Sequence, residues 1–162
     1  MAITLEAGDR APSFTLRDQD SLTHRLSDYR SRTVVLYFYP RDFTPGCTKQ
    51  ACSLRDSEAK ILAAGAVVLG VSTDDAESHQ RFRAEHGLRF PLLVDAGAKV
   101  STRYGAWREN TLYGRKNIGM TRATFIIGPD GRLLRVWKRA KAADHGEVVL
   151  KALRALSAAN EA

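Results

Sequence analysis

Three apolar runs in the first hundred positions predict strands, at 33–40, 66–72 and 90–95. The first two runs are nearly continuous in Val, Leu, Tyr and Phe, with few polar interruptions. Such runs are typical of strands that a sheet buries on both faces, as in parallel α/β sheets. Pro40 ends the first run, because proline cannot continue a ladder of backbone hydrogen bonds.

Segments between and after these runs have helical character. Helices are predicted over 47–64, from Asp74 or Asp75 to about 86, over 98–104 and over 147–159. Either aspartate is a good N-terminal cap, and Gly65 and Gly87 are good helix stops. The alternation of strand and helix predicts parallel strands joined by right-handed crossovers.

Shorter patterns complete the predicted sheet. Strands are expected at 12–17 and 22–26, and a hairpin at 121–128 and 132–138 around the Pro-Asp-Gly turn at 129–131. The segment 106–120 has mixed character and is interpreted as a loop, whose length is typical of functional loops. We expect one three-layer α/β domain over 1–162 with a central mixed sheet.

Composition agrees with a globular protein of one domain. The chain has 162 residues, of which 44% are hydrophobic and 27% charged, and this balance excludes collagen, a disulfide scaffold and a disordered chain. No run approaches the ~20 apolar residues that span a bilayer. The segment 1–6 lacks the basic and apolar regions of a signal peptide. With only two cysteines, a reducing cytoplasm is the expected location.

The net charge of +7 favours anionic partners, but no block of like charges occurs. One segment, 135–139, interleaves basic and aromatic residues, and we interpret it as a solvated strand face rather than a nucleic-acid site. His79 and His86 lie seven positions apart on one predicted helix. Metal ligands on a helix prefer spacings of three or four, so these histidines are also expected on a solvated face.

The segment that follows the first buried run carries the candidate chemistry. Thr44 is a candidate N-cap, Pro45 suits the first helical position, and Cys47 then lies in the first turn. Unpaired backbone N–H groups and the helix dipole favour the thiolate there, and the thiolate is the reactive form. The carboxyl end of a strand in an open α/β sheet is also where ligands bind. These signals indicate a reactive thiol at Cys47.

Cys52 lies five residues after Cys47. Five helical residues rise about 7.5 Å, which places the two Cα atoms roughly 8–9 Å apart, beyond the ~7 Å reach of a disulfide. Either Cys52 is a small buried residue, or the first turns of the helix unwind so that the two sulfurs can meet. The five-residue spacing of the two cysteines alone leaves both interpretations open.

The sequence Pro40-Arg-Asp-Phe-Thr44-Pro-Gly-Cys47 resembles the peroxiredoxin pattern of Pro, Thr and reactive Cys. Its continuation, Thr-Pro-Gly-Cys-Thr-Lys-Gln-Ala-Cys, is similar to the subgroup called peroxiredoxin Q or bacterioferritin comigratory protein. The segments 8–14 (Gly-Asp-Arg-Ala-Pro-Ser-Phe) and 119–125 (Gly-Met-Thr-Arg-Ala-Thr-Phe) resemble the family's opening strand and arginine segment. Gln50 stands where other members carry Glu.

The resemblance implies a thioredoxin-like fold and a thiol peroxidase acting on hydrogen peroxide and organic hydroperoxides. It implies that Cys47 attacks the peroxide and that Cys52 resolves the product through an intramolecular disulfide. Arg122 would hold the thiolate and the bound oxygens, Thr44 would hydrogen-bond at the peroxide, and Pro40 would shield the pocket. Thioredoxin or a similar dithiol protein would be the reductant, a monomer would suffice, and no metal, haem or flavin is implied.

Two other functions stay as alternatives. A dithiol-disulfide oxidoreductase shares the fold but normally uses Cys-x-x-Cys, which this chain lacks. A basic nucleic-acid-binding or chaperone-like protein could use its cysteines only to sense oxidants.

Overall fold

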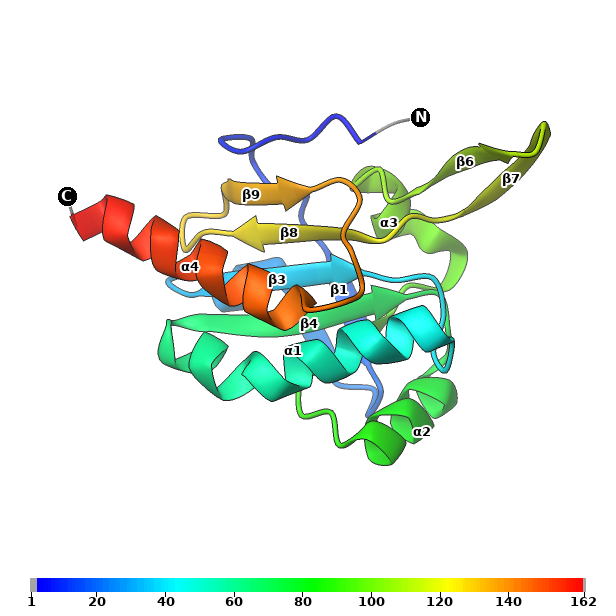
Figure 1. Cartoon of the computed structure of the whole chain (residues 1–162), viewed down its shortest axis with the longest axis horizontal. Coiled ribbons are helices and arrows are strands. Elements are labelled where there is room, and N and C mark those ends of the chain that lie inside the picture. Colours follow the sequence, from blue (N-terminus) through cyan, green and yellow to red (C-terminus); the bar gives the residue numbers. More distant parts are fainter. Residues whose placement is uncertain (1–2, 162) are drawn as a thin grey trace.

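A mixed sheet of seven strands forms the centre of the computed structural model (Figure 1). The structure describes residues 3–161, so positions 1, 2 and 162 of the expected domain lie outside the described residues. The strand order is β2-β1-β5-β4-β3-β8-β9. The central strands β3 (Thr33–Phe38), β4 (Ala66–Ser72) and β5 (Leu92–Val94) are parallel. The alternating pattern predicted these three strands and their direction.

Antiparallel strands flank the parallel centre on both sides. At one edge lie β1 (Thr15–Asp18) and β2 (Thr23–Arg25), and at the other lie β8 (Ala123–Ile127) and β9 (Leu133–Trp137). Strand β8 pairs with β3 in the register Phe38↔Ala123. The start of β8 therefore lies beside the end of β3, which places Arg122 next to the segment that follows β3.

In the described part of the chain, four α-helices and two short 3-10 helices cover the sheet. They are α1 (Pro45–Ala63), α2 (Ala76–His86), α3 (Lys99–Arg103), α4 (His145–Glu161), η1 (Leu26–Tyr29) and η2 (Ala96–Ala98). Helices α1 and α4 lie side by side on one face of the sheet (Figure 1). Helix α2 begins at the cap Asp75, whose carboxylate accepts from the Ser78 N–H, and ends at Gly87 with φ of 61°. No helix within residues 3–161 combines the length and apolar character needed to cross a bilayer.

The sheet separates two hydrophobic cores, which gives the three expected layers. Along β3, Val35 and Tyr37 pack with α1 and α4, whereas Val34, Leu36 and Phe38 pack on the opposite face. All five side chains are at most 1% exposed. This burial on both faces explains why the first apolar run has no alternation.

The predicted loop at 106–120 is wrong, because this segment is a hairpin of two strands, β6 (Trp107–Leu112) and β7 (Arg115–Met120). The hairpin projects from the body of the molecule (Figure 1). Most of its described side chains are exposed, so no buried face imposes an alternating pattern on the sequence. Tyr113 and Gly114 form the turn with φ of 53° and 75°. Both φ angles are positive, as in the two-residue hairpin turn that the pair Asn-Gly usually marks. This chain has Tyr-Gly at the turn, so the usual sequence signal is missing.

Candidate active site

Cys47 occupies the first turn of α1, directly after the end of β3. Helix α1 starts at Pro45 with Thr44 as its N-cap residue, as the sequence predicts. Cys47 is 1% exposed and packs with Tyr37 and other apolar side chains in the core between α1 and the sheet. Its sulfur thus lies close to the free N–H groups at the positive end of the helix, in a site largely shielded from water.

Arg122 lies against this sulfur. Its Nη2 donates to Cys47 Sγ at 3.5 Å, and its Nη1 donates to Gln50 Oε1 at 2.6 Å. A Cβ atom built on Gly46 would lie 3.0 Å from Arg122 Nη2, so the absence of a side chain there lets the guanidinium approach the helix. Residues far apart in the chain, Cys47, Gln50 and Arg122, thereby form one cationic cluster around the thiol.

Thr44 and Pro40 lie on the loop between β3 and α1, but the described hydrogen bonds join neither of them to Cys47. Thr44 is the N-cap by position, yet its hydroxyl donates to the Arg41 carbonyl at 3.0 Å and makes no capping bond. The cap role predicted for its side chain is therefore wrong. Pro40 is exposed and Thr44 is half-buried.

Cys52 lies on the same continuous helix as Cys47 and is half-buried. Both cysteines are free. In an intact helix their Cα atoms are roughly 8–9 Å apart by helical geometry. A bond between the two sulfurs therefore requires the first turns of α1 to open.

His79 is fully buried, which contradicts the predicted solvated face. Its Nδ1 lies 2.7 Å from Asp42 Oδ2, and its Nε2 lies 3.0 Å from the Leu93 carbonyl oxygen. Two polar partners make the burial of this polar ring tolerable. Asp42 lies in the loop that precedes α1 and is 3% exposed. Sequence reasoning missed this pair, since no local spacing connects residues 37 positions apart.

Oxygen and nitrogen atoms of Asp42, Asp74 and His79 lie within 4.8 Å of one another. They are already engaged in hydrogen bonds. Asp74 Oδ2 accepts from the Asp42 N–H and the Ser72 hydroxyl, both at 2.8 Å. Asp42 accepts from the Tyr39 hydroxyl at 2.6 Å. The arrangement is therefore a hydrogen-bonded network that joins the loop to α2, rather than a set of converging free ligands.

Burial also perturbs titratable groups around the site. It raises the pKa of Tyr37 well above the usual value, and the charges of Asp42 and Cys47 act in the same direction. Burial raises the pKa of Tyr39 as well, so both tyrosines stay neutral. Burial, with a further contribution from the Arg122 charge, lowers the pKa of His145 to about 4. His145 is therefore neutral at physiological pH.

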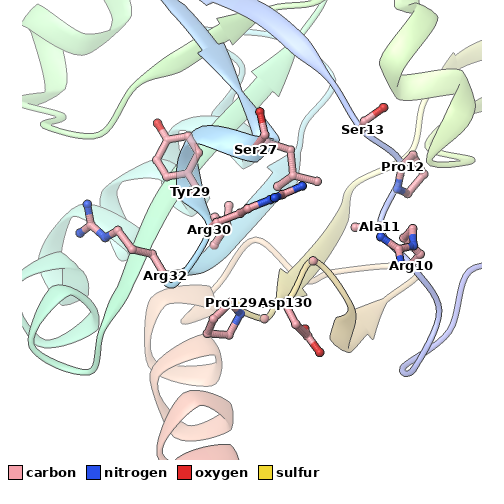
Figure 2. Close-up of a pocket in the computed structure, with 14 residues that line it drawn as sticks. Arg10, Ala11, Pro12, Ser13, Ser27, Tyr29, Arg30, Arg32, Pro129 and Asp130 are labelled. Carbon is pink, nitrogen blue, oxygen red and sulfur yellow. The ribbon is translucent and has the colours of Figure 1, made fainter.

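A separate hollow of about 330 Å³ lies at the opposite end of β3, near Val34 (Figure 2). Arg10, Arg30 and Arg32 are among the residues that line it, and all three side chains are exposed to solvent. Arg32 points away from the labelled residues of the opposite wall (Figure 2). This hollow contains no group that the Cys47 site uses.

Comparison of the chain with known proteins identifies a family. The AhpC/TSA family profile matches residues 7–136. Peroxiredoxin Bcp from Bacillus subtilis (strain 168) is 40% identical over 155 residues, covering 96% of this chain and 99% of the relative. Peroxiredoxin Bcp from Escherichia coli (strain K12) is 42% identical over 150 residues, covering 93% and 96%.

Solved structures agree with the sequence relatives. A cysteine-to-serine variant of PrxQ from Xylella fastidiosa has a TM-score of 0.88 at 35% identity, covering 94% of this chain and 98% of that one. The bacterioferritin comigratory protein of Xanthomonas campestris, studied for alkyl peroxide reduction, has a TM-score of 0.87 at 32% identity, covering 96% and 99%. The expected thioredoxin-like peroxiredoxin architecture is confirmed. The chain therefore belongs to the AhpC/TSA family, and its relatives there are peroxiredoxins of the Bcp, or peroxiredoxin Q, type.

Proposed function

We propose that this protein is a thiol peroxidase that reduces hydrogen peroxide and organic hydroperoxides through Cys47. The observation that carries the proposal is the Cys47 sulfur in the first turn of α1 with Arg122 Nη2 at 3.5 Å. The alkyl peroxide reduction of the Xanthomonas campestris relative supports the hydroperoxide class. The catalytic unit is a single domain over 1–162 that acts as a monomer.

In the first step the Cys47 thiolate attacks one oxygen of the peroxide, and the O–O bond breaks. The sulfur becomes a sulfenic acid, and the departing oxygen leaves as water or an alcohol after taking up a proton. Negative charge moves from sulfur to the departing oxygen. The Arg122 guanidinium supplies several fixed donors and a permanent charge for both atoms, which a lysine could not match in geometry. Thr44 would contact the bound peroxide, and Pro40 would limit access of water.

In the second step Cys52 attacks the sulfenic sulfur, a disulfide forms and water leaves. Because α1 keeps the two cysteines apart, the helix opens locally before the sulfurs meet. The resulting disulfide lies in an opened segment, where thioredoxin or a similar dithiol protein can reduce it by exchange. Such reductants belong to the cytoplasm, where we place the reaction.

Peroxide consumption in the presence of thioredoxin, its reductase and NADPH tests the proposal. We expect turnover in the natural protein and none in Cys47→Ser. Insulin disulfide reduction without peroxide turnover would instead indicate a dithiol-disulfide oxidoreductase. Neither activity, together with salt-sensitive binding to nucleic acid, would indicate a binding protein.

The role of Cys52 is tested separately. Cys52→Ser should leave the single-turnover oxidation of Cys47 intact while weakening recycling by thioredoxin, and unchanged steady-state turnover would contradict the assignment. Oxidation of the natural protein should also reduce hydrogen-exchange protection at the amides of 48–54. Equal protection in both redox states would show that the helix does not open.

A further inference from the structure

We propose that Asp42 and His79 are positioning residues of the peroxidase site. Their buried pair fastens the loop 40–44 to α2 and so fixes the start of α1 for the oxidation step. The proposal deepens the function proposed above and rests on it. Neither side chain is assigned a contact with the peroxide or with Cys47.

The hydrogen-bond partners define where the proton of the pair lies. The Leu93 carbonyl can only accept, so His79 Nε2 must carry a hydrogen at the 3.0 Å contact. The 2.7 Å contact between His79 Nδ1 and Asp42 Oδ2 then requires a second proton between those two atoms. Both atoms are inaccessible, since the side chains are 0% and 1% exposed. The result is a charge-assisted hydrogen bond shielded from water, which is stronger than an exposed one.

Asp42 is attached to its surroundings through both its side chain and its backbone. Its carboxylate also accepts from the Tyr39 hydroxyl at 2.6 Å and from the Ser78 hydroxyl at 2.8 Å. Its N–H donates to Asp74 Oδ2 at 2.8 Å. One residue of the loop is thus held by the end of β3, by α2 and by the segment between β4 and α2.

The next residue shows why the loop needs this attachment. Phe43 has a φ of 66°, which is unfavourable for a side chain of its size. Its ring packs edge-on against Phe82 of α2, with centroids 5.2 Å apart. A strained residue persists only where its surroundings hold it. The hydrogen bonds of Asp42 provide the polar part of this support. Thr44 and Pro45, where α1 begins, come directly after Phe43 in the chain.

Weakening the pair should therefore affect the two chemical steps in opposite directions. A loosened loop displaces the first turn of α1 from Arg122, which slows the oxidation of Cys47. The same loosening helps α1 to open, which speeds the formation of the disulfide with Cys52. If His79 only filled space in the core, the effect of a substitution would depend on the size of the new side chain and not on which hydrogen bond it keeps.

Two substitutions of one side chain provide a matched comparison. In His79→Asn, the amide nitrogen occupies the position of Nδ1 and keeps a donor toward Asp42. In His79→Gln, the amide nitrogen reaches the position of Nε2 and keeps the donor toward Leu93, but the bond to Asp42 is lost. Gln is the larger residue, so a merely space-filling role predicts that His79→Gln is the milder change. Ser78→Ala is a gentler variant for the case that His79→Gln does not fold.

The chain also offers a control pair. His24 Nε2 and Asp18 Oδ2 are 2.7 Å apart, with side chains 15% and 4% exposed, at the β1–β2 edge of the sheet. This pair has no hydrogen bond to residues 40–44 among the described contacts. Asp18→Asn should therefore leave both steps unchanged even if it lowers stability.

The measurements are the rate constant for single-turnover oxidation of Cys47, taken in the Cys52→Ser background, and the rate of disulfide formation with Cys52 present. We expect His79→Gln to slow oxidation about tenfold, the change that follows from losing one charged hydrogen bond, and to speed disulfide formation. His79→Asn should recover most of the oxidation rate, and Ser78→Ala should show a smaller effect in the same direction. Equal rates in His79→Gln and the natural protein, or a greater loss in His79→Asn, would overturn the proposal.

Hydrogen exchange of the 39–46 peptide gives a readout without peroxide. Exchange should be faster in His79→Gln than in His79→Asn, and unchanged exchange in His79→Gln would also overturn the inference. If the natural protein fails to react with peroxide, the proposed function is wrong. The exchange comparison then still decides whether the pair fastens the loop.

Discussion

His145 provides a test of how burial controls stability in this fold. It is the first residue of α4, is 2% exposed, and pairs through Nε2 with the Thr124 hydroxyl at 2.9 Å. Its ring also meets Trp137 edge-on, with centroids 5.9 Å apart. Protonation would place a buried charge close to the cationic Arg122. His145→Gln keeps a polar group near the Nε2 position but cannot titrate.

The size and sign of the effect follow from the pKa of His145, which burial lowers from 6.5 to about 4. Between those values the unfolded chain binds a proton that the folded protein refuses. The free energy of unfolding is therefore unaffected by the titration of His145 above pH 6.5. It falls as the pH drops from 6.5 towards 4, and the loss levels off below about 4. At about 1.4 kcal/mol per pH unit, the interval from 6.5 to about 4 corresponds to between about 3 and 4 kcal/mol, of which about 3 kcal/mol is reached at pH 4.

Urea unfolding between pH 4 and pH 7.5 measures this contribution. The free energy of unfolding of the natural protein should fall by about 3 kcal/mol more than that of His145→Gln as the pH is lowered. Burial also raises the pKa of Glu58, but this carboxyl is present in both proteins, so its contribution to the comparison cancels. Parallel pH profiles for the two proteins would refute the reasoning that His145 is kept neutral by burial.

Three further substitutions test other parts of the structure. Arg122→Lys replaces a two-sided donor by a single ammonium, so single-turnover oxidation of Cys47, followed by quenched-flow mass spectrometry, should slow by about 10–100-fold. Gly146→Ala places a methyl group against the Ser53 carbonyl where α4 meets α1, and urea unfolding should show a loss of about 1–3 kcal/mol. Asp75→Ala removes the cap of α2 and should cost about 1 kcal/mol in the same assay; a loss below the error of either measurement would contradict the packing or capping argument concerned.

The sequence predicted best where burial imposes a regular pattern. The runs that became β3 and β4 are apolar at nearly every position, because both faces of these strands are covered. The ends of α2 were marked by local chemistry, with a carboxylate at Asp75 and a left-handed residue at Gly87. The helical position of Cys47 also followed from neighbouring residues, since Pro45 occupies the first turn.

Features that depend on distant partners could not be predicted in this way. The burial of His79 depends on Asp42 and on the Leu93 carbonyl, which come from two other parts of the chain. Contacts of this kind are decided by tertiary geometry, which leaves no periodic trace in the sequence.

The hairpin formed by β6 and β7 has a practical consequence for probe attachment. Its tip residue Tyr113 is 96% exposed and Ile118 is 69% exposed, whereas its base is tied down where the Thr121 N–H donates to the Ala106 carbonyl. Exposed turn tips with few contacts tolerate inserted sequence better than packed elements do. A fluorophore or short epitope grafted between Tyr113 and Gly114 would therefore leave both cores untouched, which makes this tip a suitable handle for single-molecule work.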